Sequence, residues 1–217
     1  MYKRNFYFIT ILLTSTILII IFLLLIFLPK FVKKPPQVDK TTEEKTEVIK
    51  YKQSYVPKES KPGECWTISS TATSNDKAWR CMSGDFIYDP CFETETNQIV
   101  CNVDPELPES GFELKLTKPL PERGGYDKEE AKKWSWIVKL QNGLICEAIS
   151  GTAGTADGEN FYYACNRENI VILGYLDKGG PLWKAKAAYI SENEDKDALF
   201  TLKILKSEEL NIIKVWE

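Results

Sequence analysis

The chain opens with an unbroken apolar pattern. From Phe6 to Leu28 there are 23 residues without a charge, and the polar members are limited to hydroxyl side chains such as Tyr7 and Thr10. As a helix with a rise of 1.5 Å per residue, this run would be about 34 Å long, enough to cross a hydrocarbon core of roughly 30 Å. The run ends at Pro29 and Lys30 without the small residues of a signal-cleavage site. The pattern therefore predicts an uncleaved signal-anchor helix over 6–28, preceded by a short tail, 1–5.

The pattern changes after the helix. Residues 29–64 contain few large apolar side chains, no hydrophobic period and many lysines, glutamates and prolines. Such a segment buries too little surface to offset the entropy of ordering it. We therefore expect a disordered, charged stalk over 29–64, between the membrane helix and a domain that begins at residue 65.

From residue 65 onward, short apolar runs and alternating runs predict β-strands. The clearest case is Asn142-Gly143, which supplies the positive φ angles of a tight turn between strands at 136–140 and 144–149. Further strands are expected at 97–103, 160–165, 170–175, 182–190, 198–205 and 211–216. Helical signals are few: a capping-box arrangement starts at Asp127, and a short helix is expected at 75–81. The fold class is thus mainly β with a minor α contribution, as one antiparallel β-rich domain over 65–217.

Six cysteines all lie within this domain. They contain no C-x-x-C pair, which argues against a zinc ribbon or a thioredoxin-type centre. Three disulfides are expected, and sequential pairing is preferred over the fourteen other connectivities that six cysteines allow. The preferred pairs are Cys65 with Cys81, Cys91 with Cys101, and Cys146 with Cys165.

Disulfides also bear on topology. Lys3 and Arg4 before the helix nearly balance Lys30, Lys33 and Lys34 after it, so the positive-inside rule leaves the orientation open. Disulfides form in oxidising compartments, which places the domain outside the cell membrane. We expect a single-pass membrane protein with a cytoplasmic N-terminus and an extracytoplasmic C-terminal domain.

Composition removes several functional classes. The chain has no histidine, which excludes Ser-His-Asp and Cys-His catalysis and any histidine-containing metal site. Residues 65–217 hold 17 basic and 25 acidic residues, a net charge of −8. This domain lacks the basic footprint of a nucleic-acid-binding protein, so no nucleic-acid partner is expected.

No motif predicts a catalytic residue, a cofactor or a metal site. Ser74-Asn75-Asp76-Lys77 matches the S-x-x-K pattern of serine acyl-enzymes without its companion motifs, and the glycine-rich segment 151–158 lacks a phosphate-loop lysine. The acidic run 192–197 lacks the glycine and the terminal glutamate of an EF-hand. Asp85, Asp89 and Glu93 could supply two carboxylates for glycoside hydrolysis, but the sequence gives no distances between them.

Tryptophans offer a second kind of candidate. All six lie in the predicted domain, where large aromatic residues usually contribute to the core. Trp79 and Trp134 fall outside the clear strand patterns and are therefore the expected exposed exceptions. Exposed, they would be stacking surfaces for a glycan or for a protein of the envelope.

The cysteine-containing motifs occur in an order that is similar to that of a known family. Along the chain they are Cys65-Trp66, Ala78-Trp79-Arg80-Cys81-Met82, Ile87-Tyr88-Asp89-Pro90-Cys91-Phe92, Val100-Cys101, Leu-x-Asn-Gly-x-x-Cys at 140–146, Asp157-Gly158, Tyr163-Ala164-Cys165 and Pro181-x-Trp183. This order resembles an uncharacterised cysteine-rich extracytoplasmic domain of bacterial secreted or membrane-anchored proteins, some attached to receptor-type Ser/Thr kinases. The resemblance covers roughly 65–216 and implies an envelope location and disulfide use, but no activity.

Together these patterns favour a non-catalytic binding or sensing module that a single-pass helix anchors in the membrane. The alternatives are an envelope hydrolase that uses Asp and Glu carboxylates, for example on glycans, and a structural subunit of a membrane complex.

Overall fold

A computed structural model describes residues 44–107, 109–124, 128–192 and 202–217. The chain divides after residue 42, and every described residue belongs to the second unit, 43–217. The predicted tail and membrane helix, 1–28, lie outside the described residues. Among the described residues, no helix is both long enough and apolar enough to cross a membrane.

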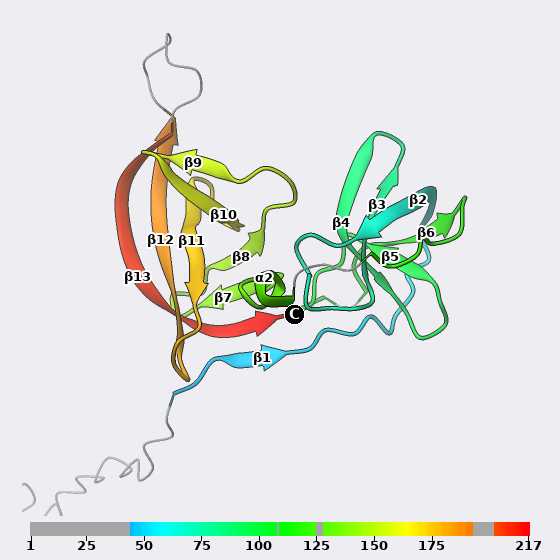
Figure 1. The fold of residues 1–217 in the computed structure, drawn as a ribbon, viewed down its shortest axis with the longest axis horizontal. Helices are drawn as coiled ribbons and strands as arrows, with labels where there is room; N and C mark the ends of the chain where they lie inside the picture. Colours follow the sequence, from blue (N-terminus) through cyan, green and yellow to red (C-terminus); the bar gives the residue numbers. More distant parts are fainter. Residues whose placement is uncertain (1–43, 108, 125–127, 193–201) are drawn as a thin grey trace, which may run out of the picture. The chain divides into compact units, whose positions relative to one another are not determined.

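The first half of the unit forms a closed β-barrel (Figure 1). Its strands are β2 (Ser60–Ile68), β3 (Ala78–Ser83), β4 (Phe86–Glu93), β5 (Ile99–Cys101) and β6 (Phe112–Leu116). Neighbours along the chain pair antiparallel, and β2 pairs with β6 in parallel, with Ser60 opposite Glu113 and Gly63 opposite Leu116. This parallel pairing closes the barrel, because it joins the first strand to the last.

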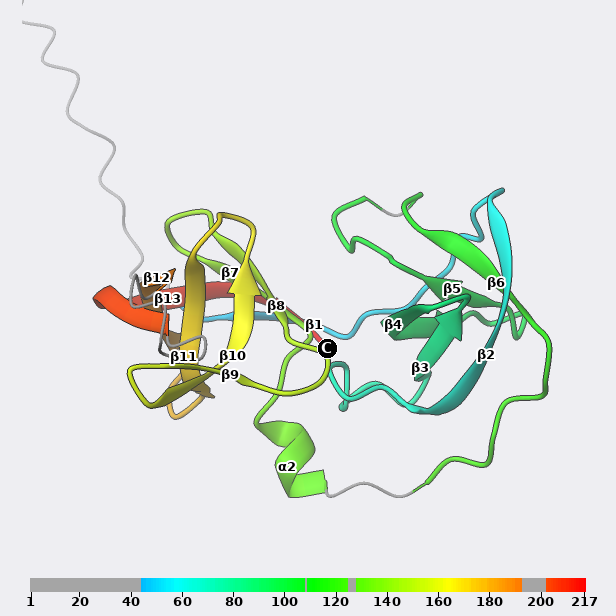
Figure 2. The ribbon, with the colours of Figure 1, turned by 90° about the horizontal axis from the view of Figure 1, so that it is seen from above.

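The second half forms a larger sheet in which the described strands follow the order β1-β13-β12-β11-β10-β8-β7, with β9 beside β10. Its strands are β1 (Glu47–Ile49), β7 (Ile137–Leu140), β8 (Ile145–Ala148), β9 (Gly154–Ala156), β10 (Glu159–Cys165), β11 (Ile170–Asp177), β12 (Trp183–Glu192) and β13 (Leu202–Trp216). The long β13 pairs with β12 over most of its length, and its end pairs with both β7 and β1. The single described helix, α2 (Lys128–Lys132), lies between the two sheets in sequence (Figure 2).

A shared hydrophobic cluster connects the barrel to the larger sheet. Phe92 of β4 packs with Trp136 and Trp216, and Tyr51 contacts the rings of Phe92 and Trp136 at centroid distances of 4.7 and 5.3 Å. Phe92, Trp136 and Trp216 are all buried. Burial of large aromatic side chains supplies much of the stability of such a junction.

The mainly β prediction is confirmed, and so are most of the strands. The Asn142-Gly143 turn separates β7 from β8, and the helix expected after Asp127 is present as α2 over Lys128–Lys132. Two local predictions are wrong. Residues 75–81 form a turn followed by β3, and residues 202–205 and 211–216, expected in two strands, belong to the single strand β13, while 198–201 lie outside the described residues.

The expectation of a disordered stalk over 29–64 needs correction from Glu44 onward. β1 and the start of β2 lie in this segment, and Thr46 and Gln53 are buried. Thr46 Oγ1 donates a hydrogen bond to the carbonyl of Ile212 at 2.7 Å. The segment gains its order from partners far along the chain, which its own composition does not reveal.

The three predicted disulfides are confirmed with the sequential pairing. Each joins two residues that face each other on neighbouring strands: Cys65 and Cys81 on β2 and β3, Cys91 and Cys101 on β4 and β5, and Cys146 and Cys165 on β8 and β10.

Candidate functional site

A hollow of about 750 Å³ lies between the residues 102–107, 110 and 111 on one side and strands β7, β8 and β10 on the other. A second hollow of about 190 Å³ shares three lining residues with it. Asn102, Val103 and Glu147 line both hollows. We refer to the two together as the Glu147 groove.

The strand pattern of β8 places Glu147 in this groove. Cys146 and Ala148 point into the core and are buried, so the side chain between them lies on the opposite face. Glu147 is paired across the sheet with Ile137 of β7 and Ala164 of β10, and the groove is also lined by both of these residues.

A tryptophan fixes the Glu147 carboxylate. The indole Nε1 of Trp136 donates a hydrogen bond to Glu147 Oε1 at 3.1 Å. Desolvation by the surrounding protein raises the pKa of Glu147, the Trp136 hydrogen bond opposes this, and the charges of Asp104 and Asp89 raise the pKa further. Glu147 is nevertheless an exposed residue of β8, so the groove holds a solvent-accessible carboxyl group whose pKa is raised.

The opposite wall is a tight loop with its own acids. The backbone N–H of Asp104 donates to Ser110 Oγ at 2.6 Å, and Asp104 Oδ1 accepts the N–H of Glu106 at 2.8 Å. Glu106 in turn pairs with Lys139 at 2.6 Å. These contacts hold Asp104 in the lining of the groove, where its charge acts on the pKa of Glu147.

The remaining walls are largely apolar, and the Lys139 charge reaches the groove through its pair with Glu106. Ile145 and Ile149 are half-buried along the sheet side, while Leu107 is 62% exposed and Ile87 is 55% exposed. No lysine or arginine occurs among the described residues that line either hollow. The groove therefore combines carboxylates with exposed aliphatic side chains, a surface suited to a cationic ligand that also has apolar groups.

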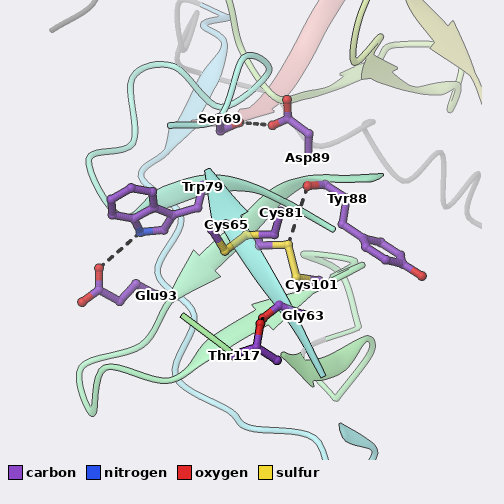
Figure 3. The surroundings of a disulfide bond; sticks show 11 residues. Gly63, Cys65, Ser69, Trp79, Cys81, Tyr88, Asp89, Glu93, Cys101 and Thr117 are labelled. Carbon is purple, nitrogen blue, oxygen red and sulfur yellow. Dashed lines mark hydrogen bonds between the residues drawn. A yellow bond between two sulfur atoms is a disulfide. The ribbon is translucent and has the colours of Figure 1, made fainter. Parts of the chain in front are cut away.

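The three carboxylates considered for glycoside hydrolysis have separate environments. The Asp89 side chain is fully buried and accepts hydrogen bonds from the Ser69, Ser70 and Thr71 hydroxyls, and it pairs with Arg80 at 3.8 Å (Figure 3). This carboxylate has its acceptor positions occupied by the protein itself, so it organises the 69–71 turn.

Neither of the other two lines the groove. Asp85 is exposed in the β3–β4 turn, and Glu93 accepts the Trp79 Nε1 hydrogen at 3.4 Å.

The expectation that Trp79 is exposed is wrong. Trp79 is 3% exposed and packs in the barrel core with Cys65 and Cys81, and the Arg123 guanidinium lies 4.8 Å from its ring centroid. The cause is the strand at 78–83: alternate residues of a strand share a face, so Trp79 and Cys81 both point inward.

Trp134 is partly exposed and belongs to an aromatic cluster. Its ring contacts Tyr162 at 5.1 Å and Tyr175 at 5.5 Å, and these two tyrosines stack on each other at 4.8 Å. Lys133 Nζ lies 5.1 Å from the Tyr175 centroid. The rings thus cover much of one another, and binding of a ligand at Trp134 stays a prediction.

The sequence patterns did not predict one polar cluster. Lys178 Nζ donates to the Trp134 carbonyl at 2.9 Å, to Ser135 Oγ at 3.1 Å and to Glu217 Oε1 at 3.1 Å. The serine and lysine resemble a catalytic dyad, but Ser135 is 1% exposed and its hydroxyl donates to Glu217. All three lysine hydrogens are engaged, so the cluster is structural.

The other sequence motifs have structural explanations or lie outside the described residues. Asn75 Oδ1 accepts the Lys77 N–H at 3.0 Å, which makes the S-x-x-K match a turn. The segment 151–158 contains β9, and the run 193–197 lies outside the described residues. Glu147 was not singled out from the sequence, where it is one acid among many on the outward face of a strand.

The comparisons with known proteins add no relative: no family model matches the sequence, and neither curated proteins nor solved structures gave a similar protein.

Proposed function

We propose that this chain is a non-catalytic binding or sensing module, anchored in the membrane by residues 6–28 and displayed on the extracytoplasmic side with its N-terminus in the cytoplasm. The length of the apolar run supports the anchor. The three disulfides support an oxidising compartment. Labelling of a C-terminal tag on intact cells tests the topology, since a tag that is protected from the reagent contradicts it.

The proposed ligand site is the Glu147 groove, and its proposed occupant is an extended segment of a partner protein in which lysine or arginine alternates with apolar residues. The observation that carries this proposal is the lining: Glu147 and Asp104 face a hollow of about 750 Å³ that has no basic residue among its described lining residues. A basic side chain would complement the carboxylates, and its apolar neighbours would cover Leu107 and Ile145.

The charge of the whole region supports the same occupant. Residues 65–217 carry a net charge of −8, so a basic segment would be attracted before contact. Such steering raises the association rate and weakens with salt. A basic partner segment should therefore bind more slowly at high ionic strength.

A titration of two synthetic peptides tests the proposal. A peptide of alternating lysine and leucine should bind the oxidised full chain, and a glutamate–leucine peptide of equal length should not. Glu147→Gln should weaken binding of the lysine peptide by about 10-fold, the equivalent of roughly 1.4 kcal/mol. The matched control is Glu168→Gln, an exposed acid outside the groove lining, which should leave affinity unchanged. Equal loss in both variants, or equal binding of both peptides, contradicts the groove as the site.

A hydrolase remains the second candidate, and one observation favours it. A carboxyl group with a raised pKa in a hollow, with another carboxylate nearby, is the arrangement of a general acid in glycoside hydrolysis. In that case Glu147 would protonate the leaving oxygen and Asp104 would be the partner carboxylate. Release of reducing sugar from envelope glycans by the native chain, with loss in Glu147→Gln, would favour this candidate over binding.

A further inference from the structure

The two disulfides of the barrel lie close to each other. The Sγ atoms of Cys81, Cys91 and Cys101 all lie within 4.8 Å of one another. Figure 3 shows the Cys65–Cys81 bond near the second disulfide, to which Cys101 belongs. Three sulfurs within 4.8 Å of one another, with the fourth, that of Cys65, bonded to Cys81, form a sulfur cluster inside the barrel.

Strand pairing explains this juxtaposition. Cys65 faces Cys81 across β2 and β3, and Cys91 faces Cys101 across β4 and β5. A register shift between β3 and β4 separates the pair Trp79–Cys91 from the pair Cys81–Tyr88. Through this irregularity both disulfides enter the same interior layer, with Phe112, Leu114 and Ile99 around them.

The four cysteines differ in access. Cys65 is 6% exposed, whereas Cys81, Cys91 and Cys101 are each 0% exposed. Cys65 is thus the one residue of these four with any exposed surface. If a thiolate attacked Cys65, the departing sulfur would be that of Cys81, which lies within 4.8 Å of both sulfurs of the second disulfide.

We propose that Cys65 is a site of thiol modification and that the two barrel disulfides act as one exchange unit. A low-molecular-weight thiolate attacks Cys65 Sγ, forms a mixed disulfide there and releases Cys81 as a thiolate. Cys81 then attacks Cys91 or Cys101, forms a new bond to that sulfur and releases the other cysteine as a thiolate. One disulfide bond forms and one breaks at each step, so the only co-reactant is the external thiol.

The physical basis is proximity. The rate of exchange depends on the thiolate fraction and on access, and a burial-raised pKa would slow an isolated thiol in an apolar core. The short separation of the reacting sulfurs, at most 4.8 Å, replaces a bimolecular encounter by an intramolecular one, which favours reaction by orders of magnitude. The third disulfide, Cys146–Cys165, joins β8 and β10 of the larger sheet, and its sulfurs do not belong to the sulfur cluster of the barrel.

Mass spectrometry of the oxidised full chain tests this inference. The protein is exposed to glutathione under native conditions, quenched with acid, denatured, alkylated with N-ethylmaleimide and digested without reduction. The expected result is a glutathione adduct on Cys65 together with alkylation of Cys91 or Cys101. Alkylation that stays on Cys81, or the absence of any adduct on Cys65, overturns the proposal.

A pair of variants provides a second route. Cys65→Ser leaves Cys81 as a free thiol beside the Cys91–Cys101 bond, so alkylation should spread from Cys81 to Cys91 or Cys101. Cys146→Ser is the matched control, since it leaves Cys165 away from the cluster and alkylation should remain on Cys165 alone. Circular dichroism confirms that each variant is folded, and if Cys65→Ser does not fold, the wild-type reaction decides. Spreading in the control as well would show general scrambling and would also overturn the inference.

Discussion

Lys178 and Glu217 form an ion pair, with Nζ 3.1 Å from Oε1, although 39 residues separate them. Lys50 approaches the other carboxylate oxygen of Glu217 at 2.6 Å. The carboxylate lies 9% exposed at the end of β13 and joins three distant segments of the chain. Its charge therefore contributes to the closing of the larger sheet.

Glu217→Gln should destabilise the protein by about 1–3 kcal/mol, because Lys178 then keeps a partly buried charge without its counter-ion. Desolvation alone would raise the pKa of Glu217, but hydrogen bonds and charge from Lys50 and Lys178 lower it on balance. Since the folded pKa lies below the unfolded one, this stabilisation is complete above the ordinary value of 4.5 and is lost as the pH falls through the folded pKa. Urea unfolding between pH 3 and pH 7 should show a shallower acid loss in the variant than in the parent.

Asp89→Asn should cost about 2–3 kcal/mol, because it removes the charge that the Ser69–Thr71 hydroxyls and Arg80 surround. Arg80 Nε already lacks a hydrogen-bond partner, so the loss of the nearby charge leaves it less compensated. Asp85→Asn, in an exposed turn a few residues away, should change the midpoint of thermal unfolding very little. Equal shifts in the two variants would contradict the role assigned to Asp89.

Gly111 and Gly84 allow the cost of a steric clash to be separated from the cost of a positive φ angle. Both have positive φ, +86° and +58°, but a Cβ on Gly111 would lie 2.3 Å from the Cys101 carbonyl oxygen, whereas a Cβ on Gly84 meets nothing within 4 Å. Gly84→Ala should therefore cost about 1 kcal/mol for the left-handed backbone alone. Gly111→Ala should cost clearly more and should also weaken peptide binding, because residue 111 lines the groove. Denaturant midpoints and the peptide titration would measure both effects.

We expect the ionised Glu147 carboxylate to destabilise the fold and to contribute to ligand binding. Its folded pKa is raised, first by desolvation and then by Asp104 and Asp89, so the ionised carboxylate costs stability above its pKa. Glu147→Gln should leave the protein at least as stable as the parent at pH 7 while it binds the lysine peptide less well. The affinity of the parent for the lysine peptide should decrease as the pH falls. Because the pKa of Glu147 is raised, this decrease should occur at a higher pH than it would with an ordinary glutamate, and a titration series from pH 4 to pH 8 would show this. A variant that is less stable at pH 7 would contradict the assignment.

Features that depend on neighbouring residues could be predicted from the sequence. Asn142-Gly143 prescribes a turn wherever two apolar runs flank it, and the cysteine spacing matched facing positions on neighbouring strands. These features depend on residues close together in the chain, so the pattern alone was sufficient to predict them.

Features that depend on distant partners were not readable. The order of residues 44–64 depends on contacts such as Thr46 with Ile212, and the Glu147 groove exists because residues 102–107, 110 and 111 lie near β8. In the sequence, Trp79 sits in a polar turn-rich stretch, and only pairing with both β2 and β4 makes it a core residue. Periodicity reports which face a residue takes within its own strand, but it does not report what covers that face.

The pairing of β1 with β13 sets an order on folding during synthesis. Glu47 lies opposite Lys214, so β1 pairs with its partner strand only after residues 214–216 have been synthesised. The β2–β6 barrel, in contrast, is complete at Leu116 and depends on pairings within 60–116. Because contacts between distant residues form late, the barrel and its two disulfides can be in place before the larger sheet closes.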